Sequence, residues 1–303
     1  MSLHIETPLV ESRPLGLAAG RRVWLKLESL QPSGSFKLRG IGLACETYRA
    51  RGARRFVSSP GGNAGLAVAY AGRRLAVPVT VVVPETTSGR ALELLRLEGA
   101  EVIVHGASWQ EANELAVSLV DADDAFIHPF DDPLIWRGHS TLIDEVRGAG
   151  LKPDAVVLSV GGGGLLCGIA EGLHRSGWGD VPIIAVETEG AASFRAALVA
   201  GAPVELDRIT SVATSLGARR VCERSVQWSR EHAIRSVLVT DRSALAACER
   251  FLADHRILVE PACGASLAIP YELAGELAGY EDVLVIACGG VTATIDQIRR
   301  WAA

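Results

Sequence analysis

The stretch Gln31–Gly40 reads Gln-Pro-Ser-Gly-Ser-Phe-Lys-Leu-Arg-Gly and places a lysine among small, turn-forming residues. A helical pattern follows over residues 38–50, so Lys37 is expected close to the start of a helix. The positive end of the helix dipole disfavours an ammonium charge there, and an uncharged amine can attack a carbonyl carbon. The stretch therefore indicates a lysine that forms a Schiff base, although an ordinary exposed loop lysine would fit the same short motif.

The composition indicates a well-buried α/β enzyme. The chain has 303 residues, of which 49% are hydrophobic, with 32 glycines and a net charge of −5. This length suits one large or two medium domains, and the acidic balance without a basic block argues against a nucleic-acid partner. Residues 1–10 lack the pattern of a secretion signal, and the uncharged run 155–170 is too short to span a bilayer. We therefore expect a cytoplasmic protein with no membrane partner.

The cysteines form neither a CxxC pair nor a cluster with zinc-ligand spacing. Most are expected to be small buried hydrophobic residues, and disulfides are rare in the expected compartment. The six positions are Cys45, Cys167, Cys222, Cys248, Cys263 and Cys288.

Short β-branched runs alternate with helical patterns along the chain, which predicts mostly parallel sheets covered by helices on both faces. Strands are expected at residues 23–28, 55–58, 79–83, 101–104, 154–160, 183–187, 237–240 and 283–287. Helices are expected at residues 38–50, 66–75, 90–98, 108–120 and 165–173, with two more starting near residues 241–243 and 260–265. Residues 130–136 fit neither pattern and are expected to form an irregular loop. Ligands of such folds bind at the carboxyl ends of the strands.

Two glycine-rich turns each follow an expected strand. Residues 59–65 read Ser-Pro-Gly-Gly-Asn-Ala-Gly and carry Asn63, although an ordinary turn would fit equally well. Residues 161–165 hold four successive glycines before a helix, where free backbone N–H groups and the helix dipole suit an anion. Their spacing matches neither the dinucleotide fingerprint nor the P-loop, so one phosphate group is favoured over a dinucleotide or ATP. A tight strand-to-helix packing turn is the alternative.

A Schiff-base lysine, an asparagine in a glycine loop and a cradle for one phosphate together resemble fold-type II pyridoxal 5′-phosphate enzymes. Longer motifs resemble the L-serine/L-threonine dehydratase family, closest to the liver-type enzymes, from about residue 7 to about residue 298. The matching motifs are Pro-Ser-Gly-Ser-Phe-Lys (32–37), Phe-Asp-Asp-Pro-Leu-Ile-Trp (130–136), Ser-Val-Gly-Gly-Gly-Gly-Leu-Leu-Cys-Gly (159–168), Gly-Trp-Gly-Asp-Val-Pro (177–182), Val-Glu-Pro-Ala-Cys-Gly-Ala (259–265) and Cys-Gly-Gly (288–290).

The resemblance implies an architecture of two three-layer αβα domains with mostly parallel sheets, similar to the tryptophan synthase β subunit. Residues 1–37 and 137–303 would form a large cofactor-binding domain, and residues 38–136 a small domain. The cofactor would lie in the cleft between them. The resemblance also implies a homodimer.

The resemblance further implies roles for the matching residues. Lys37 would hold the cofactor covalently and later take the Cα proton, while Phe36 and Ser215 would lie on opposite faces of the cofactor ring. Asn63 would bind the ring hydroxyl, and Cys288 would face the pyridine nitrogen. A neutral thiol cannot keep that nitrogen protonated as an aspartate would, which suits β-elimination. The phosphate would be bound by Gly161, Gly162, Gly163, Gly164 and Leu165.

The implied reaction is the dehydration and deamination of L-serine or L-threonine to pyruvate or 2-oxobutanoate and ammonia. The cofactor phosphate would protonate the departing hydroxyl group. The expected substrate contacts are Ser59, Pro60, Gly61, Gly62, Asn63, Ala64 and Phe130. Relatives also hold an alkali cation such as potassium, and the matching positions are Gly161, Glu187, Ala191, Ser193, Leu216 and Ala218. Glu187 could instead be a solvated carboxylate at the end of a strand.

One position departs from the pattern of the family. Relatives carry a serine three residues before the loop asparagine, where this chain has Pro60. That serine would contact the substrate carboxylate and the reacting centre, and the neighbouring Ser59 is expected to point elsewhere. Three alternatives therefore stay open: a lyase for another β-substituted amino acid, a β-replacement enzyme, and a weakly catalytic cofactor-binding protein.

Overall fold

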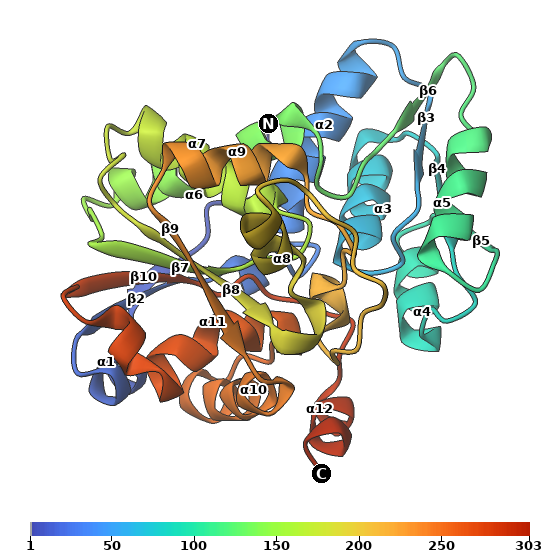
Figure 1. Ribbon diagram of the computed structural model, residues 1–303. Helices are drawn as coiled ribbons and strands as arrows, with labels where there is room; N and C mark the ends of the chain where they lie inside the picture. Colours follow the sequence, from blue (N-terminus) through green and yellow to red (C-terminus); the bar gives the residue numbers. More distant parts are fainter. Residues whose placement is uncertain (1) are drawn as a thin grey trace.

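The computed structural model describes residues 2–303 and contains two β-sheets flanked by helices (Figure 1). The larger sheet has six strands in the order β1-β2-β10-β7-β8-β9, and the smaller has four in the order β5-β4-β3-β6. Every strand pair is parallel except β1–β2, which lies at one edge of the larger sheet. The predicted α/β class with mostly parallel sheets is therefore confirmed.

The strands are β1 (Leu9–Glu11), β2 (Arg22–Lys26), β3 (Arg55–Ser58), β4 (Val79–Val83), β5 (Glu101–Val104), β6 (Asp124–Phe126), β7 (Ala155–Ser159), β8 (Ile183–Thr188), β9 (Ile234–Val239) and β10 (Asp282–Ile286). The α-helices are α1 (Arg13–Ala19), α2 (Lys37–Ala50), α3 (Asn63–Leu75), α4 (Gly89–Leu97), α5 (Trp109–Ser118), α6 (Pro133–Gly148), α7 (Gly164–Arg175), α8 (Ser193–Ala200), α9 (Glu223–Glu231), α10 (Asp241–His255), α11 (Pro261–Glu272) and α12 (Ile295–Ala302). The 3₁₀ helices are η1 (Glu28–Leu30), η2 (Glu189–Ala191), η3 (Thr214–Leu216) and η4 (Ala274–Leu277).

The core of the larger sheet is apolar because helices cover both of its faces. In Figure 1, α6 and α7 lie above the sheet, whereas α1, α10 and α11 lie below it. Every residue of β7 and β8 is buried, which is why these strands read as continuous apolar runs rather than as alternating ones. Among residues 2–303, no helix is long and apolar enough to cross a bilayer.

Some predicted boundaries are wrong for identifiable reasons. Residues 130–136 are only partly irregular, because α6 starts at Pro133 and the Asp132 side chain caps it by accepting a hydrogen bond from the Leu134 N–H. Helix α10 starts at Asp241, as expected, and is capped by Thr240, which accepts from the Ser243 N–H. Strand β9 begins at Ile234, three residues before the expected start.

The cysteine expectations are confirmed, since all six are buried and free. Cys167 and Cys222 lie near each other, with their sulfur atoms 3.7 Å apart. Among residues 2–303, no group of three or more His, Cys, Asp or Glu side chains could hold a metal ion.

Candidate active site

Three loops meet beside the carboxyl ends of the strands and bring the predicted site residues together. The Phe36 N–H donates to the Cys288 carbonyl at 3.1 Å, which ties the lysine loop to the loop after β10. The Val291 N–H in turn donates to the Asn63 Oδ1 atom at 3.3 Å, which ties that loop to the start of α3. Residues 36, 63 and 288 are far apart in the sequence, so tertiary folding alone assembles this group.

Lys37 is the first residue of α2, so the predicted position at a helix start is confirmed. Its Nζ atom donates to the Pro129 carbonyl at 2.7 Å. Burial lowers the pKa of Lys37 to about 8, although the nearby Cys288 and Glu260 oppose this change. Burial is thus the main cause of the lowered pKa, because a charged ammonium loses its hydration there.

Lys37 is also the one lysine of this chain that is placed for chemistry. The sequence contains three lysines. Lys26 is buried in an ion pair with Glu145, and Lys152 is a surface residue paired with Asp180. A carbonyl-bearing cofactor bound at the three loops would therefore meet the amine of Lys37.

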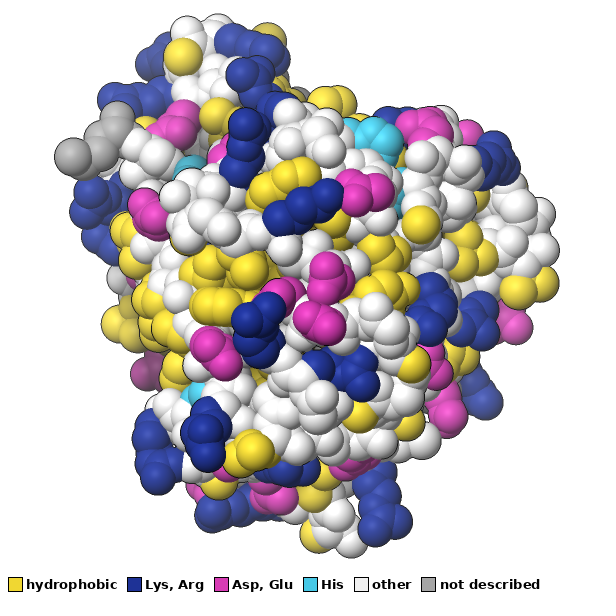
Figure 2. All heavy atoms as spheres, turned by 90° about the vertical axis from the view of Figure 1, so that its left-hand side faces the viewer, with side chains coloured by type: hydrophobic (Ala, Val, Ile, Leu, Met, Phe, Trp, Pro, Cys, Tyr) yellow, Lys and Arg dark blue, Asp and Glu magenta, His cyan; other side chains and the backbone are white. Residues whose placement is uncertain are grey.

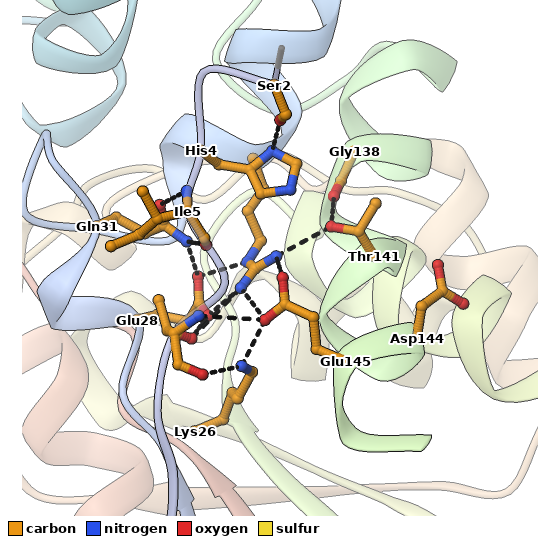
Figure 3. A network of polar contacts seen from close by, with 12 residues as sticks. Ser2, His4, Ile5, Lys26, Glu28, Gln31, Gly138, Thr141, Asp144 and Glu145 are labelled. Carbon is orange, nitrogen blue, oxygen red and sulfur yellow. Dashed lines mark hydrogen bonds and ion pairs between the residues drawn. The ribbon is translucent and has the colours of Figure 1, made fainter. Parts of the chain in front are cut away.

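A buried ion network fixes the first turn of α2, two residues beyond Lys37 (Figure 3). Arg39 is fully buried, and its guanidinium donates to both oxygens of Glu28, at 2.7 and 2.8 Å. It also donates to both oxygens of Glu145, at 2.6 and 2.7 Å. Lys26 completes the network through Glu145, so two cations balance two anions. The network joins β2, η1, α2 and α6 and thereby anchors the helix that carries Lys37.

The residues predicted to surround the cofactor ring lie close to one another. Lys37 Nζ is 5.2 Å from the centre of the Phe36 ring, and Ser215 Oγ is 3.5 Å from Asn63 Nδ2. Cys288 is 6% exposed. A hydrogen bond with Cys263 and burial raise the pKa of the Cys288 thiol well above its usual value, so the thiol is neutral at physiological pH. This matches the neutral partner that the sequence predicts for the pyridine nitrogen.

The tetraglycine turn between β7 and α7 forms a cradle of donors. Within residues 2–303, no acceptor takes the backbone N–H groups of residues 161–165, which stand at the N-terminus of α7. Side chains would block the turn, because a Cβ on Gly162 would overlap the Phe130 ring, and Gly163 has a φ of +93°. Free N–H groups at a helix N-terminus suit a phosphate, so these residues fit the phosphate-bearing cofactor that the sequence predicts.

The loop before α3 offers backbone donors but few side-chain donors. The Ser59 hydroxyl donates to Asn113 Oδ1 at 2.8 Å, as expected for a side chain that points away from the site. Pro60 has neither a hydroxyl group nor an N–H. In the described part of the chain, the N–H groups of residues 61–65, which include Gly61, Gly62 and Ala64, have no acceptor. They lie at the N-terminus of α3 and could bind a carboxylate.

The predicted cation position contains a buried carboxylate. Glu187 is fully buried and accepts hydrogen bonds from the backbone N–H groups of Phe194 and Arg195, at 2.7 and 2.8 Å, so the alternative of a solvated carboxylate is wrong. Burial raises its pKa to about 7. The Ser193 hydroxyl is also buried and has no hydrogen-bond partner within residues 2–303. Of the other expected positions, Ala191 and Leu216 are buried, and Gly161 and Ala218 are half-buried.

One residue of this site, Glu260, is not among the site residues predicted from the sequence. Its carboxylate accepts from Asn63 Nδ2 at 2.5 Å and from Thr292 Oγ1 at 2.9 Å. An acidic residue before Pro261 predicts a helix cap, but Glu260 makes no side-chain hydrogen bond to its own helix. The available signal was therefore a glutamate in a cap position, which by itself does not indicate a site.

Comparison with known proteins gives strong matches along nearly the whole chain. The family model described as pyridoxal-phosphate dependent enzyme matches residues 1–289. The human protein named L-serine dehydratase/L-threonine deaminase is 48% identical over 308 residues, covering 98% of this chain and 94% of that protein. The L-serine dehydratase of Dictyostelium discoideum is 44% identical over 318 residues, covering 98% and 91%. The L-serine ammonia-lyase structure from the fungus Rhizomucor miehei has a TM-score of 0.94 at 36% identity, covering 100% of both chains.

These matches agree with the geometry, because the family model includes the lysine loop, the asparagine loop and the glycine cradle in one continuous range. The relatives align over almost their entire lengths, so the similarity is not confined to one motif. The chain therefore belongs to the family of pyridoxal-phosphate-dependent enzymes of fold type II and, within it, to the group of L-serine dehydratases and L-threonine deaminases.

Proposed function

We propose that this protein is a pyridoxal-phosphate-dependent ammonia-lyase that converts L-serine and L-threonine to pyruvate or 2-oxobutanoate and ammonia. The observation that carries the proposal is Lys37, a half-buried lysine with a pKa near 8 whose amine lies over the Phe36 ring and close to Cys288 and Glu260. The curated relatives named for L-serine and L-threonine support the choice of substrates.

Different residues of the chain bind different parts of the cofactor. The N–H groups of residues 161–165 bind the phosphate, Asn63 binds the ring hydroxyl, and Phe36 and Ser215 enclose the ring. Bound pyridoxal phosphate supplies an electron sink for the substrate carbon that loses its proton. Lys37 takes this proton, and its lowered pKa keeps a useful fraction of the amine uncharged near neutral pH. The neutral Cys288 thiol leaves the pyridine nitrogen unprotonated, which favours loss of a β-substituent.

The substrate carboxylate binds the free N–H groups of residues 61–65, beside Pro60 and the Phe130 ring. The Ser59 hydroxyl donates to Asn113, and Pro60 has no hydroxyl group, so neither residue offers a hydroxyl to the substrate. A lyase for a different β-substituted amino acid is therefore the second candidate. Purified holoenzyme incubated with L-serine, L-threonine and larger β-substituted amino acids distinguishes the two by the release of 2-oxo acid. The proposal expects ammonia and 2-oxo acid in equal amounts from L-serine and L-threonine. Release from another substrate alone would contradict it.

A monovalent cation such as potassium is proposed to bind beside the phosphate, between Glu187, Ser193 and backbone carbonyls of Gly161, Ala191, Leu216 and Ala218. The buried Glu187 carboxylate and the unpartnered Ser193 hydroxyl support this proposal. Replacing a bulky organic cation with potassium at equal ionic strength is expected to raise the reaction rate. An unchanged rate would count against a functional site.

We also propose a cytoplasmic homodimer with a large domain of residues 1–37 and 137–303 and a small domain of residues 38–136. The division agrees with the membership of the two sheets, because β3 to β6 all lie within residues 38–136. Figure 2 shows apolar side chains gathered near the middle of one face with charged side chains around them, a composition suited to contact with a second subunit. Light scattering on the purified protein is expected to give twice the mass of 32.0 kDa, and a monomer mass would contradict the dimer.

A further inference from the structure

Glu260 occupies the N-cap position of α11, but its side chain does not cap this helix. It directly precedes α11, where an oxygen-bearing side chain normally accepts from the helix's own free N–H groups. Its carboxylate makes no such bond. The side chain instead extends into the active site and is only 4% exposed.

The two carboxylate oxygens of Glu260 connect two loops of the site. One oxygen accepts from Asn63 Nδ2 at 2.5 Å, and the other accepts from Thr292 Oγ1 at 2.9 Å. Asn63 Oδ1 is used as well, because it accepts from the Val291 N–H at 3.3 Å. An amide nitrogen carries two hydrogens, so the bond to Glu260 uses one N–H of Asn63 and fixes the direction of the other. In this structure that second N–H makes only a long hydrogen bond, to Ser215 Oγ at 3.5 Å, which a bound acceptor could replace.

The burial of this carboxylate opposes its charge. Burial raises the pKa of Glu260, while hydrogen bonds from Ser215, Thr292 and Asn63 and the charge of Lys37 act in the other direction. A buried carboxylate costs stability unless its partners compensate, and a neutral side chain could fill the same space. The space itself is tightly defined, since a Cβ on Gly290 would overlap the Glu260 side chain. A carboxyl group kept under these conditions, next to the proposed cofactor contacts, indicates a role in the site.

We propose that Glu260 is a positioning residue, which holds the Asn63 amide so that its second N–H faces the ring hydroxyl of bound pyridoxal phosphate. The inference rests on the proposed function, specifically on Asn63 as a contact of the cofactor ring. Glu260 acts through Asn63 and touches neither the substrate nor the reacting atoms. The bond between them is charge-assisted, and such bonds are about twice as strong as neutral ones.

The test is a double-mutant cycle read out by cofactor affinity. The dissociation constant of pyridoxal phosphate is measured by titrating the cofactor-free protein and its variants Glu260→Ala, Glu260→Gln, Asn63→Ala and Glu260→Ala/Asn63→Ala. Loss of a hydrogen bond to a charged group predicts about 10- to 100-fold weaker binding in Glu260→Ala. Glu260→Gln recovers much of this loss, because its amide oxygen still accepts from Asn63. The double variant binds no more weakly than Asn63→Ala alone, because the two residues act as one unit.

Thr292→Val is the matched variant, since it removes the other hydrogen bond to the same carboxylate without changing the Asn63 contact. Because Thr292 contacts Glu260 and not Asn63, the loss of cofactor affinity is expected to stay below about 10-fold. Additive losses in the double variant would overturn the proposal. So would equal losses in Glu260→Ala and Glu260→Gln accompanied by a lower melting temperature of the cofactor-free protein, which is the signature of a structural role. Unchanged affinity in Asn63→Ala would instead contradict the proposed cofactor contact itself.

Discussion

At the scale of the residue, the site depends on the protonation of Lys37. Its pKa lies near 8 because burial removes hydration from the ammonium form. A group with a lowered pKa gives up its proton earlier as the pH rises, so the reactive amine gains population between neutral pH and about pH 9.

This predicts the pH dependence of cofactor attachment to the cofactor-free protein. The rate of attachment, followed by the absorbance of the bound cofactor, is expected to rise with pH and to reach half of its maximum near pH 8. A half-maximum near the ordinary lysine value of about 10.5 would show that Lys37 is not desolvated in solution.

The second prediction for a single residue concerns Pro60 and the catalytic efficiency with L-serine. The Pro60→Ser variant supplies a hydroxyl group beside the N–H groups that bind the substrate carboxylate. A hydrogen bond to a charged group corresponds to about 10- to 100-fold in kcat/KM, so the efficiency with L-serine is expected to rise by this factor. The comparison is made at equal cofactor content. An unchanged efficiency would mean that the backbone N–H groups of residues 61–65 already supply the contacts that matter.

At the scale of the element, the start of α2 is held by the ion network around Arg39. The Arg39→Met variant leaves the buried Glu28 and the half-buried Glu145 without the guanidinium that they share. Removing one member of a buried ion pair costs about 3–5 kcal/mol, so the free energy of unfolding should fall by this amount in denaturant titrations.

The surface residue Arg73 is the control for this prediction. It pairs with Glu98, and the two side chains are 49% and 26% exposed. Because solvent screens such a pair, Arg73→Met is expected to cost less than about 1 kcal/mol. Equal losses in the two variants would contradict the special role of the buried network.

The elements also show what the sequence can predict. Strands β3, β4 and β5 match their predicted bounds, because compact runs of strand-forming residues between polar or turn-forming residues leave little ambiguity. The prediction of an irregular loop at residues 130–136 is wrong at the start of α6, where Asp132-Pro133 is a good helix-start signal. The ion network escaped prediction for a different reason. Tertiary packing brings together Glu28, Arg39 and Glu145, so no local sequence pattern predicts their ion pairs.

At the scale of the whole molecule, the sequence predicted the α/β class, and the motif resemblance supplied the family and the proposed site residues. The free cysteines were also predicted correctly. Glu260 was not found, because its local context suggests a helix cap and its partners Asn63 and Thr292 come from other parts of the chain. Side chains that act across the site in this way are visible only once the loops are assembled.

The proposed function depends on a cofactor that is bound covalently to Lys37. Borohydride reduction of the purified holoenzyme fixes the cofactor to its lysine, and peptide mapping then locates it among the three candidates Lys26, Lys37 and Lys152. The proposed function predicts label in the peptide that contains Lys37 and none in the other two, because Lys26 is buried in an ion pair and Lys152 lies on the surface. Label on Lys26 or Lys152, or a protein that retains no reducible cofactor, would contradict it.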